Sequence, residues 1–229
     1  MIENTSITIT IDGPSSSGKS TVGEKLAHNI GYNFLDTGCL YRALTVATLQ
    51  RNIPITDTDT IIKLAGDIDI VVKPSTVEDG RQYTVLIDKV DVTWELRSSS
   101  TDTNVSLIST IPDVRHLLTE QMRSIAKGAN VVMVGRDIGT VVVPEAPLKF
   151  YLDASIDERA RRRHNENMRN GQESDYKEIL VNLQARDDID TQRDNAPLKK
   201  PTNAYIINTT TMKPKNVLKE MLRIFHTVI

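Results

Sequence analysis

Residues 7–30 read ITITIDGPSSSGKSTVGEKLAHNI. Isoleucine and threonine alternate up to Asp12, which is the pattern of a β-strand that runs into a turn. Val22, Leu26 and Ile30 then follow at helical spacing. A strand, a loop and a helix in this order form the unit that builds parallel sheets, so we expect this strand to be buried in spite of its alternation.

The loop between the expected strand and helix matches the phosphate-loop pattern GxxxxGK[ST] at every fixed position. Its glycines allow backbone N–H groups to converge on a polyphosphate, Lys19 can reach the β- and γ-phosphates, and Ser20 can bind Mg²⁺. A serine-rich turn that caps a helix by chance is disfavoured, because the flanking elements are correct. We therefore expect ATP to bind to Gly13, Pro14, Ser15, Ser16, Ser17, Gly18, Lys19, Ser20 and Thr21.

The composition is that of a folded chain with one substantial domain: 229 residues, 39% apolar and 25% charged. No apolar run has the length of a membrane span, and the first residues do not resemble a secretory signal. The single cysteine, Cys39, excludes an internal disulfide framework. The net charge of −2 and the 4% aromatic content argue against a nucleic-acid polymer as partner. We expect a cytoplasmic protein without a membrane partner.

Further apolar runs at 131–134, 148–152 and 204–207 are predicted to be strands of the same parallel sheet. Amphipathic helices are predicted behind Pro112 and Pro214. Between these elements the chain changes character, and short strands at 68–72, 83–87 and 90–92, with a turn at Asp79–Gly80, indicate an antiparallel insert. The predicted fold class is therefore α/β, with a central parallel sheet and an attached insert.

Nucleotide-binding switches share the phosphate loop, so an enzyme has to be distinguished from a signalling module. A GTPase would carry an N-K-x-D guanine-binding motif and a D-x-x-G switch, and the sequence contains neither. Motor and helicase ATPases usually have an apolar strand that ends in Asp, whereas the strand here continues Val134-Gly135-Arg136-Asp137. A kinase of a small molecule is favoured.

Arginines occur where a kinase needs cations around two phosphate chains. Arg42 follows a hydroxyl and a glycine at the start of a predicted helix, where it could bind an acceptor phosphate or simply lie at the surface. Ile179, Leu183, Arg186, Asp190 and Arg193 share one helical stripe, which predicts either a charged cleft or exposed salt bridges.

A third group of arginines follows a predicted capping box, Ser155 to Glu158. Arg159, Arg162 and Arg163 share one helical face, and Arg161 points elsewhere. A solvated basic helix is the commoner structure for such a run. Its place after a core strand also suits a mobile lid that brings arginines to the γ-phosphate.

Four segments together resemble the successive motifs of bacterial cytidylate kinases. They are DTGCLYRALT (36–45), VGRDIGTVVVPEAPLKFYLDAS (134–155), ERARRR (158–163) and RDDIDTQRDNAPLKKPTNAYIINTT (186–210). The phosphate loop is common to many families, but GRDIGTVV followed by RDDxDxxRxxAPL is specific to this one. The resemblance spans nearly the whole chain.

The resemblance implies Mg²⁺-dependent transfer of the γ-phosphoryl group of ATP to CMP or dCMP by a monomer. It implies one phosphate-loop kinase domain over residues 1–229, with a monophosphate-binding insert at about 37–105 and a helical lid at about 155–170. The alternatives that remain are a uridylate or shikimate kinase and, more distantly, a non-catalytic nucleotide-binding module.

The resemblance also assigns roles to residues. The acceptor phosphate would be bound by Thr37, Arg42, Arg136 and Arg193, the ribose by Arg186 and Asp190, and the base by Ser106, Arg115 and Asp137. The lid would contribute Arg159, Arg162 and Arg163. The catalytic residues would be Lys19, Arg136, Arg162 and Arg193, with Ser20 as the metal ligand. Cytosine offers an amino donor to the Asp137 carboxylate, whereas uracil would oppose it with a carbonyl oxygen.

Three positions depart from the family pattern. Val134 stands where many relatives have an acidic residue, so the carboxylate expected near Mg²⁺ is missing, and restoring it should not weaken activity. Lys89 replaces the usual glycine of a hairpin, which predicts that the turn is not of the favoured Asp-Gly type. Ser16 also replaces a glycine, and we expect any small residue to be sufficient there.

Overall fold

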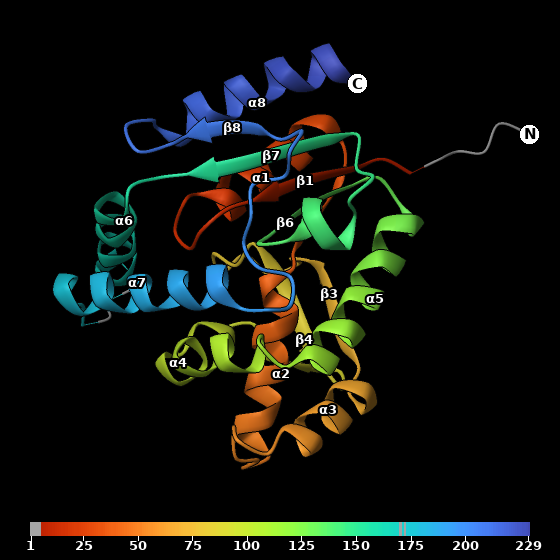
Figure 1. The fold of residues 1–229 in the computed structure, drawn as a ribbon, viewed down its shortest axis with the longest axis vertical. Coiled ribbons are helices and arrows are strands. Elements are labelled where there is room, and N and C mark those ends of the chain that lie inside the picture. The colour runs from red at the N-terminus through yellow and green to blue at the C-terminus, as the bar shows by residue number, and fades with distance from the viewer. Residues whose placement is uncertain (1–5, 170, 172) are drawn as a thin grey trace, which may run out of the picture. The chain divides into compact units, whose positions relative to one another are not determined.

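The computed structural model of the protein describes residues 6–169, 171 and 173–229 (Figure 1). The chain divides into two compact units. The first contains the residues up to Leu35 and those from Ala126 to Ile229, and the second is Asp36–Ile125. The description of the chain as one kinase domain with an insert and a lid stays a prediction.

The first unit is built on a five-stranded sheet with the strand order β2-β6-β1-β7-β8. Strand β1 pairs in parallel with β6 and β7, and β7 pairs in parallel with β8. This confirms the predicted parallel sheet, with strand ends within one residue of those expected. The strands are β1 (Thr8–Asp12), β2 (Asn33–Asp36), β6 (Val131–Gly135), β7 (Leu148–Asp153) and β8 (Tyr205–Asn208).

Strand β1 is buried along its whole length, threonines included, as predicted from its place before the loop and helix. Strand β2 was not predicted from the sequence. Only Leu35 of its four residues is fully buried, so no apolar run marks it as a strand.

Helices pack on this sheet and on one another (Figure 1). Helix α1 (Lys19–Ile30) packs against β6 and against α8 (Pro214–Val228). Their apolar faces enclose a core with the strands, to which Leu26, Phe150 and Met221 contribute fully buried side chains. Helix α6 (Ile156–Arg169) follows β7 and packs against α7 (Tyr176–Gln192). A single turn of π-helix, η2 (Ile138–Val142), follows β6.

The second unit contains the predicted antiparallel sheet, in the order β3-β4-β5. Its strands are β3 (Ile70–Pro74), β4 (Tyr83–Ile87) and β5 (Val90–Asp91). Its helices are α2 (Gly38–Gln50), α3 (Thr58–Asp67), the 3₁₀ turn η1 (Glu95–Arg97), α4 (Ser99–Ile108) and most of α5 (Pro112–Gly128), whose residues from Ala126 on belong to the first unit. Strand β3 begins two residues later than predicted because Ile68 caps α3, where its N–H donates to the Leu64 carbonyl.

The turn between β4 and β5 corrects the expectation drawn from Lys89. Ile87 pairs with Val90, and both residues between them have left-handed backbones, with φ of 49° at Asp88 and 71° at Lys89. Positive φ at both central residues is the signature of a type I′ turn, which normally requires glycine. Asp88 holds this conformation through its carboxylate, which accepts the Asp69 N–H and pairs with Arg51.

Over the residues that the structure describes, no helix combines the length and the apolar character needed to span a bilayer.

Candidate active site

The phosphate loop leaves β1 through Gly13, whose φ of 146° is closed to other residue types. A Cβ at this position would lie 2.1 Å from the Leu152 carbonyl oxygen, so the loop also depends on close contact with β7. Gly18, with φ of 98°, precedes α1. Ser16 has φ of 60°, so our expectation that a small side chain is sufficient was incomplete. The position favours glycine for its backbone conformation and not only for its size.

Lys19 is the first residue of α1 and is buried. Its Nζ donates to the Pro14 carbonyl at 2.6 Å and to Ser17 Oγ at 3.4 Å. The ammonium group is therefore held over the loop by oxygens of the loop itself. Phosphate oxygens are stronger acceptors than a carbonyl oxygen, so a bound polyphosphate could take over these contacts. Ser20 follows in the first turn of the helix and is partly buried.

Arg159 links three parts of the first unit. Its guanidinium donates to the Ala154 carbonyl, to the Ser15 carbonyl in the loop at 3.3 Å, and to the Asp187 carboxylate of α7 at 2.6 Å. The side chain is buried, so this charge-assisted pair is shielded from solvent. Arg159 thus positions α6 against both the phosphate loop and α7.

Arg162 lies one turn later and also contacts the loop. Its Nη1 donates to the Ser17 carbonyl at 3.2 Å, and its Nη2 donates to the Thr209 carbonyl at 2.5 Å. Thr209 directly follows β8 and is buried, and its hydroxyl donates to the same Ser17 carbonyl. In contrast, the Arg161 side chain is 61% exposed and pairs with Glu158. Arg163 has a mostly buried side chain, 3.9 Å from Glu166.

The predicted capping box at the start of α6 is only half formed. Ser155 Oγ accepts the Glu158 N–H at 3.3 Å, as such a box requires. The return bond is absent among the described residues, because the Ser155 N–H donates to Thr210 Oγ1. The Glu158 carboxylate is instead paired with Arg161 and Arg162, which draw it away from the helix end.

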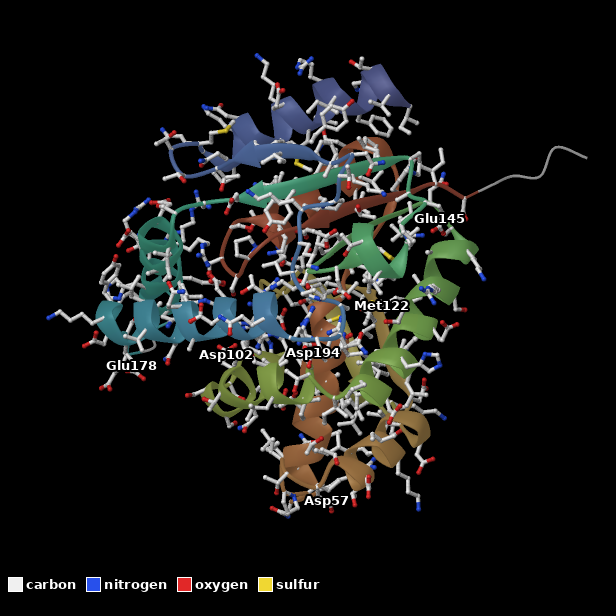
Figure 2. The ribbon with its side chains drawn as sticks, in the orientation of Figure 1. Asp57, Asp102, Met122, Glu145, Glu178 and Asp194 are labelled. Carbon is white, nitrogen blue, oxygen red and sulfur yellow. The ribbon has the colours of Figure 1, made fainter. Side chains whose placement is uncertain are left out.

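Four charged side chains from two elements meet beyond the end of β6. Arg136 Nε donates to Asp190 Oδ2 of α7 at 2.8 Å. Arg193, which caps α7, lies 3.6 Å from both Asp190 and Asp137, and its Nε donates to the Ala196 carbonyl. Figure 2 labels Glu178 near the start of α7 and Asp194 just past its end, which locates this charged end of the helix.

The electrostatics of this group keep Asp190 ionised. Burial acts to raise the pKa of the Asp190 carboxyl, but the charges of Arg136, Arg186 and Arg193 outweigh burial, and the pKa is lowered. Three arginines thus act on one buried anion, and one of them, Arg193, also lies near the Asp137 carboxylate. Such a group can exchange its internal pairs for those of an anionic ligand.

The second unit holds the four other predicted acceptor residues. Arg42 is buried on α2, where it donates to the Leu96 carbonyl at 2.7 Å and to Asp102 at 2.6 Å. Arg115 of α5 lies over the ring of Tyr41, 5.3 Å from its centroid, and donates to the Ser109 carbonyl. Thr37 and Ser106, on α2's N-terminus and on α4, are buried.

Comparison with known proteins establishes the family. The family model described as cytidylate kinase matches residues 9–227. The chain belongs to the cytidylate kinase family. A cytidylate kinase of Caldanaerobacter subterraneus is 43% identical over 218 residues, which cover 95% of this chain and 94% of that protein. One from Roseiflexus castenholzii is 51% identical over 183 residues, covering 80% and 79%.

A solved structure agrees with the fold of this family member. An uncharacterized protein from Eubacterium ventriosum has a TM-score of 0.51 at 13% identity, covering 96% of this chain and 98% of that one. At that identity the likeness concerns the fold alone.

Sequence reasoning missed several residues that organise the site in this cytidylate kinase family member. Asp187 and Thr209 hold Arg159 and Arg162 of α6, and Asp102 and Tyr41 hold Arg42 and Arg115 of the second unit. Asp187, Thr209 and Tyr41 lie inside the quoted family motifs, but no periodicity marks them as partners of an arginine. Asp12 is the fifth. It lies directly before the phosphate loop, which was the one available signal.

Val134, the most conspicuous departure from the family pattern, belongs to the core. Its side chain is buried, and a Cβ added to Gly23 of α1 would lie 2.7 Å from Val134 Cγ1. Gly23 is one helical turn beyond Ser20, so the Val134 position faces the helix that carries the expected metal ligand.

Proposed function

We propose that this protein transfers the γ-phosphoryl group of ATP to CMP or dCMP, producing ADP and CDP or dCDP. The observation that carries the proposal is the charged group of Arg136, Asp137, Asp190 and Arg193 in the unit that contains the phosphate loop. Family membership supports the identity of the acceptor.

The reaction needs little chemistry from the protein beyond positioning and charge. The attacking group is a phosphate oxygen that is already ionised near neutral pH, so no general base is required. Catalysis then rests on cations that stabilise charge on the transferred group. Lys19 would exchange the Pro14 carbonyl for a phosphate oxygen, and Arg162 would exchange the carbonyls of Ser17 and Thr209. Arg159 and Arg163 would belong to the same lid.

The acceptor would be bound through its phosphate, its ribose and its base. Arg136 and Arg193, together with Thr37 and Arg42 of the second unit, would bind the phosphate. Arg186 and Asp190 would contact the ribose. Asp137, with Ser106 and Arg115, would recognise cytosine, because a carboxylate accepts the amino group of cytosine and repels the carbonyl oxygen of uracil. The 3.6 Å contact between Arg193 and Asp137 also permits a purely structural role for Asp137.

Mg²⁺ fits the donors present. No group of three or more His, Cys, Asp or Glu in the described part of the chain could hold a metal ion. Both Asp12 carboxylate oxygens accept backbone N–H groups instead. Mg²⁺ commonly binds through one or two protein oxygens, phosphate oxygens and water, so the Ser20 hydroxyl would serve as its protein ligand. When bound, the ion would offset the charge of the ATP phosphates.

We further propose that the protein works as a monomer in the cytoplasm. The support is the family resemblance, together with a single, buried cysteine.

The test is an assay of ADP release with CMP, dCMP, UMP, AMP and shikimate as acceptors. CMP and dCMP should give the highest kcat/KM. If kcat/KM were higher with UMP or shikimate than with CMP and dCMP, that compound would be the acceptor in place of CMP. Nucleotide binding without turnover of any acceptor would indicate a non-catalytic module.

A further inference from the structure

Asp12 is a buried carboxylate to which the proposed reaction gives no role. It is the last residue of β1, immediately before the phosphate loop, and it has no exposed surface. Its Oδ1 accepts the N–H of Ile138 at 2.8 Å, and its Oδ2 accepts the N–H of Gly139 at 2.7 Å. Both donors lie on η2, directly after Arg136 and Asp137. Asp12 therefore contacts the segment that carries two proposed acceptor-binding residues.

The Arg136–Asp137 segment is held at both of its ends. On one side, Gly135 is in register with Asp12 in the ladder between β1 and β6. On the other side, the Asp12 carboxylate fixes the first two residues of η2, and the Asp137 carbonyl accepts the N–H groups of Val141 and Val142. Only two residues separate the ladder from the carboxylate's partners. The backbone of Arg136 and Asp137 consequently has little freedom while both anchors persist.

The hydrogen bonds between Asp12 and the N–H groups of Ile138 and Gly139, here called the anchor, depend on close packing at Gly139. A Cβ at Gly139 would lie 2.7 Å from Thr10 Oγ1 and 3.2 Å from Asp12 Oδ2. Any larger residue would push the backbone away from the carboxylate. Thr10 lies on the same face of β1, is fully buried, and its hydroxyl has no hydrogen-bond partner among the described residues. Thr10 therefore contacts Gly139 by van der Waals packing and not by a hydrogen bond.

We infer that Asp12 is a positioning residue for acceptor recognition, acting through the N–H groups of Ile138 and Gly139 on the Arg136–Asp137 segment. The inference rests on the proposed function, since it assumes that this segment binds CMP. The N–H groups of Ile138 and Gly139 require two acceptor oxygens, which an ionised carboxylate provides. An amide of the same size would place an NH₂ group against a backbone N–H, so one hydrogen bond would be lost and a repulsion added.

The surroundings of Asp12 agree with an ionised group near neutral pH. Burial raises the pKa of its carboxyl to about 6, and the Asp137 charge acts in the same direction. The N–H groups of Gly139 and Ile138 and the Lys19 ammonium oppose that rise.

The experiment compares Asp12→Asn and Gly139→Ala, which disturb the same pair of hydrogen bonds from opposite sides. Thr10→Val is the matched control, because it keeps the shape of a buried neighbour and removes a hydroxyl without a partner. Three quantities are measured on the full chain: CMP binding, binding of a non-hydrolysable ATP analogue, and amide hydrogen exchange of segment 136–142. Kinetics with CMP complete the comparison.

Both disturbing variants should raise the Kd and KM for CMP by about tenfold or more, the factor expected for losing one hydrogen bond to a charged group. Affinity for the ATP analogue should change by less than about threefold, and exchange should accelerate in segment 136–142. The double variant should be no worse than the poorer single variant, because both remove one interaction. Thr10→Val should resemble the parent.

Two results would overturn the inference. One is CMP affinity that stays unchanged in Asp12→Asn. The other is an equal loss of affinity for CMP and the ATP analogue with faster exchange throughout the first unit, which would indicate a general structural role. A parent protein that binds no CMP would refute the proposed function instead. Local acceleration of exchange in segment 136–142 would then still support the anchor.

Discussion

Lys19 shows at the scale of a single residue how the phosphate loop holds a buried cation. Its ammonium group is buried and donates to oxygens of the loop. In the proposed function a polyphosphate would replace the Pro14 carbonyl with little reorganisation of Lys19, which is the condition for an effective electrostatic catalyst.

We predict that Lys19→Ala lowers kcat by a hundredfold or more, roughly the loss seen when one preorganised donor is removed. The charge is needed chiefly as the phosphoryl group transfers, so kcat should fall more than substrate affinity. Steady-state kinetics with CMP and ATP measure this, and thermal melting controls for the fold. Turnover within threefold of the parent would contradict the role given to Lys19.

At Val134, the structure indicates that a carboxylate would cost free energy of folding. The sequence alone did not predict this cost. The sequence suggested that a restored carboxylate would help to bind Mg²⁺. The structure shows a side chain packed in the core against Gly23. An unpaired carboxylate there has to be desolvated, which is strongly unfavourable unless a cation lies nearby.

We therefore predict that Val134→Asp lowers the free energy of unfolding by about 3 kcal/mol or more without Mg²⁺ and ATP, and recovers part of that loss when both are present. Val134→Asn is the control. Asn has the size of Asp but no charge, so Mg²⁺ and ATP should not restore the free energy of unfolding of this variant. Urea unfolding with and without Mg²⁺–ATP measures both. An Asp variant as stable as the parent without Mg²⁺, or one that Mg²⁺–ATP does not stabilise more than the Asn variant, would refute this.

At the scale of elements, the hairpin between β4 and β5 shows that a turn type can be kept without its preferred residue. Glycine is normally needed for the left-handed backbone at position 89, yet Lys89 adopts φ of 71°. Contacts of Asp88 with Arg51 and with the Asp69 N–H hold the neighbouring residue. A rule based on residue type alone cannot include contacts made from elsewhere in the fold.

We predict that Lys89→Gly raises the free energy of unfolding by about 1 kcal/mol, because glycine adopts this φ without steric cost. Lys89→Ala removes the same side chain but keeps the unfavourable backbone, so it should match the parent. Urea unfolding of the three proteins is the measurement. If the Gly and Ala variants were equally stable, the strain argument at Lys89 would be wrong.

The elements that could be predicted are those whose signal is local. The strand, loop and helix at residues 7–30 and the helices behind Pro112 and Pro214 carry their own periodicity and caps. Strand β2 could not be predicted, since it has one fully buried residue and is defined by its neighbour β6. The prediction of the return bond in the capping box was also wrong because of a contact with another residue. The Glu158 carboxylate pairs with Arg162.

At the scale of the whole molecule, motif order carried more information than any one motif. The phosphate loop alone left several classes of protein open, and the later segments narrowed them to one family. The sequence also predicted roles for particular arginines and aspartates, which stay predictions, but it did not indicate how their side chains are held. Asp12, Asp187 and Thr209 act through partners distant in sequence, and only the fold brings these partners together.

The proposed function requires that the Arg136–Asp137 segment recognises a cytidine monophosphate. Asp137→Asn keeps the size of the side chain and replaces an acceptor by a donor, so CMP should lose a charge-assisted hydrogen bond, for which about 1.5–3 kcal/mol is typical. UMP should lose less, or gain, because its carbonyl can accept from the amide.

The most direct test is the ratio of kcat/KM for CMP over UMP in the parent and in Asp137→Asn. We predict a parent ratio well above one that falls by about tenfold or more in the variant, since each 1.4 kcal/mol corresponds to one factor of ten. If both substrates were depressed equally and thermal stability fell, Asp137 would be a structural partner of Arg193. An unchanged ratio in a stable variant, or a parent that prefers UMP, would contradict the claim.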